Sequence, residues 1–361
     1  MTLKEIAAEL GVSYSTVSRV INNYNRNFSV RPELREKILA KVAELHFQPN
    51  REFSELRKKS NRQFAILLPF SVRGLGDSGD RDSLYVIEKY LAAHHCNFEY
   101  LPFVNESELG FRLPKWHAAG FLAFDTITLD QLAGVEKSNI PYVVTNGICG
   151  ENGTAVRHDD YEAVNVICDW LYKMKHWRIA YVQIALPRHD DYERDLYDFG
   201  VSHTVRNTPP AHHSTRLRIN AFIDFCRGHA MPELCDQITS REELKECFDR
   251  YLAAGVTAVV GYNFKSGMIA MQELHNRGLE IPEDVSVIVF DDTDYNNYTI
   301  PTLSCFRLPS MEMGKHSAQL IIQRSKDSSY ARGKTFYHLG RIIERDSVCP
   351  PRHAFTPRQK K

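Results

Sequence analysis

The chain begins, at residues 2–22, with the stretch TLKEIAAELGVSYSTVSRVIN. Thr2 and Glu5 have the spacing of a capping box, which predicts that a helix begins here. Apolar residues then recur at helical intervals: Leu3, Ile6, Ala7 and Leu10. Gly11 supplies a turn, and Ser13 can cap a second helix. The inward positions of that second helix are Val17, Val20 and Ile21. Two short helices joined by a glycine-containing turn are typical of a helix-turn-helix.

A third helix is expected to begin near Pro32, a residue suited to the first helical turn, and Pro49 prevents its continuation. Its apolar positions are Leu34, Ile38, Val42 and Leu45. The three apolar stripes can close a small core, because each helix then buries its stripe against the other two. Residues 1–49 are therefore expected to form a small all-α, three-helix domain.

The second predicted helix points a row of hydrogen-bonding side chains away from this core: Tyr14, Ser15, Ser18, Arg19 and Asn22. Such a face suits the major groove of DNA, where an arginine can bind a guanine through two hydrogen bonds. The alternative is an ordinary solvated helix face. Residues 1–62 hold 12 basic and 7 acidic side chains, a net of +5, which favours DNA as the partner.

The order and spacing of these pieces resemble the head of the lactose and galactose repressor family. The resemblance rests on residues 2–7, 11–22 and 35–37, followed by Pro49-Asn50. It implies that Tyr14, Ser15 and Arg19 read bases, and that Ser13, Thr16 and Asn22 lie on or near phosphates. Ser18 and Asn50 complete the expected DNA-contact surface of the head. The segment from Asn22 to Val30 is longer than is common in that family, so the phosphate contacts of this loop stay open.

Residues 50–62 form a polar, basic linker that is too short and too charged to hold a helix unaided. The resemblance implies that this linker folds into a hinge helix on operator DNA, with Leu56 inserted as an apolar wedge in the minor groove. Phe53 stands where the family commonly has alanine. It can enlarge the contact between two hinge helices or act as a second wedge, or it can be a surface aromatic that packs on the body.

Short apolar runs alternate with helical patterns through the rest of the chain. The apolar runs are residues 64–68, 120–124, 142–144, 179–182, 258–260 and 285–290, and the helical patterns are residues 84–93, 161–173, 218–227, 242–254 and 266–277. This alternation predicts parallel sheets flanked by helices.

The resemblance extends in scattered stretches to about residue 348. It implies an α/β body of two Rossmann-like lobes joined by three crossovers, like a periplasmic sugar-binding protein. The expected domains are the helix-turn-helix head at 1–49, the hinge helix and linker at 50–62, the effector-binding and dimerisation body at 63–348, and a basic tail at 349–361.

Ligands bind in such bodies at the carboxyl ends of the parallel strands. Four polar residues are expected at these ends: Asn146, Arg218, Asn263 and Asp291. Phe70, with Ser71 beside it, follows the first predicted strand and could stack on a sugar ring. Taken singly, each residue could equally cap a loop, but together they match the effector positions that the resemblance implies. Asn146, Phe264 and Leu308 depart from the residues frequent in the family, which allows a more apolar or unusual effector.

The charges of the chain are divided between its parts. Its 361 residues are 43% hydrophobic and 25% charged, with 45 basic and 45 acidic side chains. Residues 63–349 hold 29 basic and 38 acidic side chains, a net of −9, whereas residues 350–361 hold four basic and no acidic ones. Since DNA repels an acidic body, the head and hinge are expected to bind it. Eight scattered cysteines without a C-x-x-C pair, and the lack of a run of roughly 20 apolar residues, favour a soluble cytoplasmic protein.

A glycine motif offers a competing interpretation. Residues 74–79, GLGDSG, match the G-x-G-x-x-G dinucleotide signature, and Glu99 follows at a suitable distance. The chain would then be an NAD-linked oxidoreductase with a helix-turn-helix appendage. However, the glycines do not follow the preceding strand directly, and Asp77, Asp80 and Asp82 would repel phosphate. A mobile loop over the effector cleft is preferred.

The sequence therefore predicts a transcription regulator, a repressor that acts as a homodimer on a pseudo-palindromic operator and responds to a small carbohydrate. Neighbouring histidines on one strand or helix rarely face the same ion, so no metal site is expected. No cofactor and no enzymatic activity are expected either, because nucleophile motifs and paired catalytic carboxylates are not evident. The basic end of the chain, which lacks a leucine heptad, argues against a tetramer.

Overall fold

The computed structural model describes residues 3–21, 30–44, 62–69, 79–103, 118–124, 129–184 and 213–352. The chain divides into two compact units, Met1–Asn61 and Arg62–Lys361. No helix within the described ranges is both long and apolar enough to cross a membrane.

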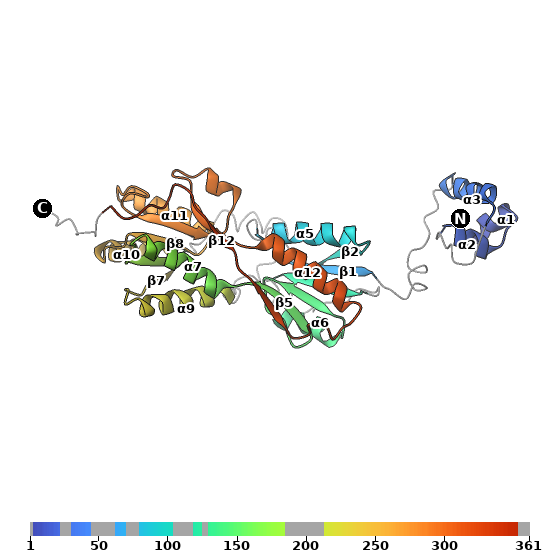
Figure 1. The fold of residues 1–361 in the computed structure, drawn as a ribbon, viewed down its shortest axis with the longest axis horizontal. Coiled ribbons are helices and arrows are strands. Elements are labelled where there is room, and N and C mark those ends of the chain that lie inside the picture. The colour runs from blue at the N-terminus through green and yellow to red at the C-terminus, as the bar shows by residue number, and fades with distance from the viewer. Residues whose placement is uncertain are drawn as a thin grey trace, which may run out of the picture. The chain divides into compact units, whose positions relative to one another are not determined.

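Three helices make up the described part of the first unit, namely α1 (Leu3–Glu9), α2 (Tyr14–Ile21) and α3 (Pro32–Glu44) (Figure 1). Their buried core consists of Ile6, Ala7, Val17, Val20 and Ile38. Gly11 turns the chain between α1 and α2 with a φ of +63°. A residue with a Cβ atom would be strained in this left-handed conformation. The predicted helix-turn-helix and its three-helix core are confirmed.

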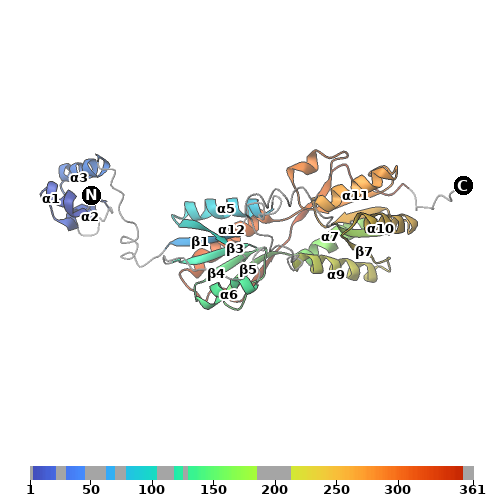
Figure 2. The same cartoon turned by 180° about the vertical axis from the view of Figure 1, so that it is seen from behind.

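The second unit contains two six-stranded sheets. The first has the order β11-β5-β4-β3-β1-β2, and all its neighbouring strands are parallel. Its strands are β1 (Gln63–Pro69), β2 (Asn97–Phe103), β3 (Gly120–Phe124), β4 (Tyr142–Thr145), β5 (Gly153–His158) and β11 (Thr335–His338). One face packs against α5 (Gly79–Ala93) and α12 (Ser310–Arg324), and the other against α6 (Leu129–Lys137), as Figure 2 shows from behind.

The second sheet has the order β12-β10-β9-β8-β6-β7, and only the β10–β12 pair of these strands is antiparallel. Its strands are β6 (Ile179–Ile184), β7 (Leu234–Ile238), β8 (Ala258–Gly261), β9 (Ser286–Phe290), β10 (Ser304–Arg307) and β12 (Arg341–Ile343). Helices α7 (Asp160–Lys173) and α9 (His213–Gly228) cover one face, and α10 (Arg241–Ala253) and α11 (Phe264–Asn276) cover the other. A 3-10 turn, η3 (Asp294–Asn297), follows β9.

The described chain passes between the two sheets three times. The passages join β5 to α7, β10 to α12, and β11 to β12. Hydrogen bonds tie these crossovers together: the amide of Asp159 donates to the carbonyl of His338 over 2.9 Å, and the hydroxyl of Ser83 on α5 donates to the carbonyl of Ser310 over 2.8 Å. The two α/β lobes joined by three crossovers agree with the prediction.

The crossovers also fix where a ligand can bind. β5, β10 and β11 all end at a crossover, so the carboxyl ends of the parallel strands in both sheets face the junction between the lobes. Polar residues that follow these strands are thereby gathered at this junction.

Candidate functional site

The outward face of α2 is set by the packing of its inward face. Val17 and Val20 are buried, whereas Tyr14 is 44% exposed and Ser15 and Arg19 are also exposed. A helix that buries one stripe against two neighbours must present its other side to solvent, which is where the predicted base-reading residues lie. Ser18 is half-buried at the edge of this face.

Hydroxyl groups gather where α2 begins. The Oγ atom of Ser13 accepts a hydrogen bond from the amide of Thr16 over 3.1 Å, so the predicted cap is confirmed. The same Oγ lies 2.8 Å from the hydroxyl of Ser15 and 2.8 Å from that of Thr16. Hydroxyls and amides at the start of a helix are suited to phosphate oxygens.

Several predicted site residues lie outside the described residues: Asn22, Asn50, Phe53, Leu56, Phe70 and Ser71. The same holds for residues 74–78 of the glycine motif. The described part of the chain nevertheless shows that β1 ends at Pro69 and α5 begins at Gly79. A dinucleotide-binding turn connects its strand and helix much more directly.

A buried ion pair lies at the carboxyl end of the second sheet. Arg218 on α9 donates from Nε to Oδ1 of Asp160, the first residue of α7, over 2.7 Å. It also donates from Nη1 to the carbonyl of Tyr262 over 2.8 Å. Its guanidinium carbon lies 3.8 Å from the ring centroid of Phe290 and 4.9 Å from that of Tyr262. The guanidinium is thus held by one carboxylate, one carbonyl and two aromatic rings.

The charges of this pair stabilise each other. Burial alone would raise the pKa of Asp160, but the guanidinium of Arg218 holds this pKa below its usual value. Burial opposes the charge of Arg218 as well, yet Asp160 raises its pKa. In the neighbouring His158, burial outweighs the opposing effect of the Asp160 charge and lowers the pKa of the imidazole to about 4. At neutral pH the site therefore holds an ion pair beside an uncharged imidazole.

Three buried polar atoms at this place have no hydrogen-bond partner among the described residues: Oδ2 of Asp160, the hydroxyl of Tyr181 and Nε2 of His158. Buried polar atoms are rarely left in this state, because each one forfeits its hydrogen bonds to water. The arrangement suits a polar ligand that supplies the missing partners. None of the three was predicted as a site residue, since nothing in the local sequence distinguishes Asp160 from its neighbour Asp159.

The other predicted effector residues differ in their surroundings. Asn263 caps α11, and its Oδ1 accepts from the amide and the hydroxyl of Ser266, each over 2.9 Å, so the capping alternative describes what its side chain does. Asp291 follows β9 with a φ of +72°, and it interacts electrostatically with Arg218. Asn146 follows β4 in the other sheet with a φ of +56°. The structure thus brings Arg218 and Asp291 together, whereas Asn146 belongs to the opposite lobe.

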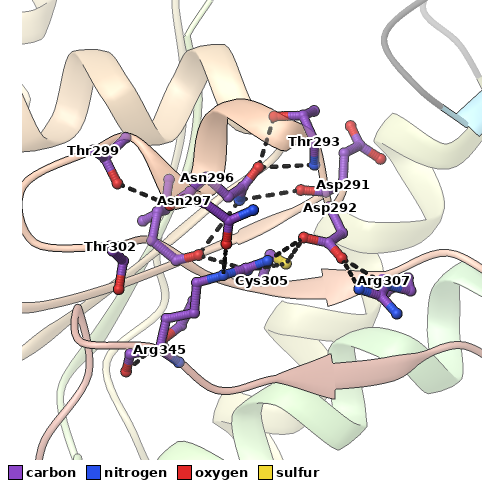
Figure 3. A network of polar contacts seen from close by, with 12 residues as sticks. Asp291, Asp292, Thr293, Asn296, Asn297, Thr299, Thr302, Cys305, Arg307 and Arg345 are labelled. Atoms are coloured by element: carbon purple, nitrogen blue, oxygen red, sulfur yellow. Dashed lines mark hydrogen bonds and ion pairs between the residues drawn. The ribbon is translucent and has the colours of Figure 1, made fainter.

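A polar network fixes the chain after β9 (Figure 3). Asp292 accepts from Nη2 of Arg345 over 2.6 Å and from Nε of Arg307 over 2.6 Å. Burial would raise the pKa of Asp292, but hydrogen bonds from these two arginines hold it below the usual value. The buried side chain of Asn296 accepts from the amide of Thr293 over 2.8 Å and donates to the carbonyl of Asp291 over 3.4 Å. The backbone of Asp291 is therefore held firmly.

A cavity of about 540 Å³ adjoins this network at the crossovers. It is lined by residues of the second and third crossovers, by Asp82 of α5, and by Asp291, Asp292 and Asp294 after β9. Leu308, one of the residues that depart from the family pattern, contributes apolar surface to it. The cavity lies where the lobes join, so the groups that line it belong to both.

Comparisons with known proteins identify the kinds of domain that the chain contains. Residues 2–50 match the family model described as bacterial regulatory proteins, lacI family, and residues 169–348 match the periplasmic binding protein-like domain. The chain carries a LacI-family helix-turn-helix domain and a periplasmic-binding-protein-like domain. This confirms the resemblance inferred from the sequence.

The relatives of this chain with curated names include transcription regulators. The ribose operon repressor of Bacillus subtilis is 25% identical over 335 residues, which cover 89% of this chain and 90% of that protein. The HTH-type transcriptional regulator AscG of Escherichia coli is 25% identical over 366 residues, covering 97% and 99%. These relatives favour the regulator over the oxidoreductase interpretation.

Solved structures of the family share the fold of the whole chain. The lac repressor dimer bound to operator and an anti-inducer matches with a TM-score of 0.71 at 18% identity, covering 97% of this chain and 99% of that one. The regulator CelR in complex with cellobiose matches with a TM-score of 0.61 at 21% identity, covering 96% and 99%. A LacI-family regulator of Enterococcus faecium with bound ribose matches with a TM-score of 0.59 at 20% identity, covering 80% and 99%.

Proposed function

We propose that this protein is a sequence-specific repressor that binds a pseudo-palindromic operator as a homodimer. Its affinity for the operator falls or rises when a small carbohydrate binds. The observation that carries the proposal is the presence, in one chain, of the exposed polar face of α2 and of buried, unpartnered polar atoms between two lobes. The repressor names of the relatives, and the solved complexes with operator, cellobiose and ribose, support it.

In this proposal the head reads DNA through α2 and the residues after it. Tyr14, Ser15 and Arg19 contact base edges in the major groove, where arginine can form two hydrogen bonds to guanine. Ser13, Thr16 and Asn22 lie on or near phosphates, and Ser18 and Asn50 complete the DNA-contact surface. Leu56 and Phe53 belong to the minor-groove contact of the linker, where apolar side chains can open a base step.

The effector occupies the junction between the lobes. The second lobe contributes Arg218, Asn263 and Asp291. The first lobe contributes Asn146, together with Phe70 and Ser71, which follow β1 in the sequence. We add Asp160, Tyr181 and His158, because they are buried there with unused hydrogen-bonding atoms. Hydroxyl groups both donate and accept, so a sugar can satisfy a carboxylate oxygen, a phenol and a neutral imidazole together.

The proposal involves binding and release only. The protein then acts where its operator is, in the cytoplasm, and has no catalytic role. Effector control requires only that the effector bind the DNA-competent and DNA-incompetent states with different affinities.

A base-contact experiment tests the DNA-binding half. Operator sequences are first selected from random DNA by the full chain, and binding is then measured by fluorescence anisotropy. Arg19→Ala is expected to lose about 1 to 3 kcal/mol on the selected operator and little on random DNA, because a base contact carries sequence information. Lys37→Ala, which removes an exposed charge from α3 in the same head, is the matched control.

The control variant is expected to change the affinity for selected DNA and for random DNA by similar factors. Equal losses on both DNAs for Arg19→Ala would show that Arg19 does not read a base. A wild-type chain that selects no sequence at all would contradict the proposed function itself.

A further inference from the structure

We propose that the effector is a polyhydroxy compound without a negative charge, and that the cleft discriminates against sugar phosphates and sugar acids. This inference rests on the proposed function, since it concerns the same cleft. It follows from how the charges at the carboxyl end of the second sheet are already paired. The pairing involves Arg218, Asp160 and Asp291, which α9, α7 and the end of β9 bring together.

The cation of this cleft is already engaged. Tight binding of a phosphate or carboxylate by arginine normally uses two parallel N–H donors. In Arg218, Nε donates to Asp160 over 2.7 Å and Nη1 donates to the carbonyl of Tyr262 over 2.8 Å. One flat face of the guanidinium is covered by Phe290 at 3.8 Å. An incoming anion could use Nε only by displacing the buried carboxylate of Asp160, so a two-donor contact is restricted to Nη1 and Nη2, and Nη1 already donates to Tyr262.

Around Arg218, the described carboxylates outnumber the guanidinium group. Arg218 interacts with two carboxylates, those of Asp160 and Asp291, so the three side chains together carry one net negative charge. The uncharged His158 adds no cation at neutral pH, because burial lowers its pKa to about 4. Nε2 of His213 on α9 lies 3.9 Å from Oδ2 of Asp160. A positive charge on this ring would therefore pair with the carboxylate of Asp160.

One unused atom, Oδ2 of Asp160, requires a hydrogen-bond donor. Oδ2 of Asp160 is a buried carboxylate oxygen without a partner among the described residues, and an ionised carboxylate can only accept. A sugar hydroxyl can donate to it. An ionised phosphate or carboxylate oxygen cannot, and it would place a second negative charge beside the buried carboxylate of Asp160. The hydroxyl of Tyr181 can donate or accept, so a ligand hydroxyl can form a hydrogen bond with it as well.

The neighbouring cavity strengthens this bias. Its lining contributes five carboxylates, Asp82, Asp291, Asp292, Asp294 and Glu312, against two guanidinium groups, Arg307 and Arg341. Arg307 is itself paired with Asp292. The local field at the junction is therefore negative, as is that of the body as a whole, which carries a net charge of −9 over residues 63–349.

Paired ligands give the sharpest test. The full chain is titrated by calorimetry with ribose, glucose, glucosamine and cellobiose, and with ribose 5-phosphate, glucose 6-phosphate and glucuronate. We expect at least one compound without a negative charge to bind, and to bind at least tenfold more tightly than its anionic counterpart. A tighter anionic counterpart overturns the inference, and so does a chain that binds operator but none of the uncharged compounds.

A charge-removing variant assigns the discrimination to the cleft. Asp160→Asn keeps the size of the side chain and an oxygen that can accept from Arg218, but it removes the charge. We expect the preference for the uncharged compound to shrink at least tenfold. Asp224→Asn removes the same charge from an exposed position on α9, the helix that carries Arg218, and is expected to leave the preference unchanged. Equal effects of the two variants overturn the role of Asp160.

A second variant protects the test from a folding defect. Asp291→Asn also removes a carboxylate of the cleft, and asparagine tolerates the left-handed backbone that Asp291 adopts. It is expected to shift the preference in the same direction as Asp160→Asn. Operator binding by each variant is measured in parallel. A wild-type protein that does not bind operator contradicts the proposed function. A wild-type protein that binds operator but prefers anionic sugars contradicts this inference alone.

Discussion

Arg218 and Asp160 are both buried, with side-chain exposures of 6% and 1%. A buried ion pair is balanced between lost hydration and mutual attraction, so removing one partner is much more damaging than removing both. Arg218→Met should therefore lower the free energy of unfolding by about 3 to 5 kcal/mol, because the carboxylate of Asp160 is left uncompensated. The double variant Arg218→Met/Asp160→Leu should recover most of that loss. Urea unfolding of the three proteins measures both, and additive losses would contradict the coupling.

His176 makes stability depend on pH. Its buried ring is held between the hydroxyl of Thr257, 2.9 Å from Nδ1, and the carbonyl of Cys349, 2.9 Å from Nε2. Burial lowers the pKa of His176 from 6.5 to about 4, so the folded state favours the neutral ring. The unfolded chain binds the extra proton first as the pH falls. The stabilisation is therefore complete above pH 6.5 and is lost progressively down to about pH 4.

The corresponding variant is His176→Gln, which cannot be protonated. At pH 7.5 it should be less stable than the wild type, because one or both of the ring's hydrogen bonds are lost. Between pH 6.5 and 4.5 its stability should fall by about 2 to 3 kcal/mol less than that of the wild type. Exposed His275 provides the control, His275→Gln. Parallel stability curves for the wild type and His176→Gln would refute the assignment.

At the scale of elements, α12 approaches α5 closely through a glycine. A Cβ atom on Gly314 would lie 2.4 Å from the carbonyl oxygen of Ser83, a backbone atom that cannot rotate away. Gly314→Ala should therefore separate the two helices and destabilise the body by about 1 to 3 kcal/mol, as overpacking does. Gly228→Ala, at the end of α9, is the control, since no atom lies within 4 Å of its added Cβ. Thermal unfolding midpoints that fall equally in both variants would contradict this packing argument.

Complete burial explains which strands were predicted most closely. β3, β4 and β9 are buried at every residue, and their apolar runs marked them almost to the residue. β7, at the edge of its sheet, and the short β11 and β12 at the third crossover are largely unburied, so they carry no such run and were not predicted. α9 begins at His213, five residues before the predicted start at Arg218, because its first turn buries Ser214 and Thr215 rather than apolar residues.

The cleft was less predictable than the elements that form it. Arg218 and Asp291 could be proposed because each lies at a recognisable strand end or family position. Asp160 is paired with Arg218 across 58 positions of the sequence, and only the packing of α7 on α9 brings them together. Tyr181 resembles any other residue of a buried strand until its hydroxyl is seen to lack a partner among the described residues.

At the scale of the whole molecule, charge and fold divide in the same place. The unit Met1–Asn61 contains the basic helix-turn-helix, and the unit Arg62–Lys361 contains the acidic two-lobed body. A formal net charge of zero thus hides one part that attracts DNA and another that repels it. The proposed effector residues all belong to the second unit, so any influence of the effector on operator binding has to pass through a change of that body's conformation.

Such an influence is reciprocal. If the effector changes operator affinity by some factor, the operator must change effector affinity by the same factor, which is typically about 5- to 150-fold. We expect anisotropy titrations of operator, with and without saturating effector, and calorimetric titrations of effector, with and without operator, to give one coupling factor. Ser83→Ala removes the hydrogen bond from α5 to Ser310 at the second crossover, and it should lower that factor several-fold. Ser138→Ala removes a hydrogen bond at the end of α6, which does not adjoin a crossover, and should leave the coupling factor unchanged. Two unequal factors in the wild type would mean that the two ligands do not share a single equilibrium.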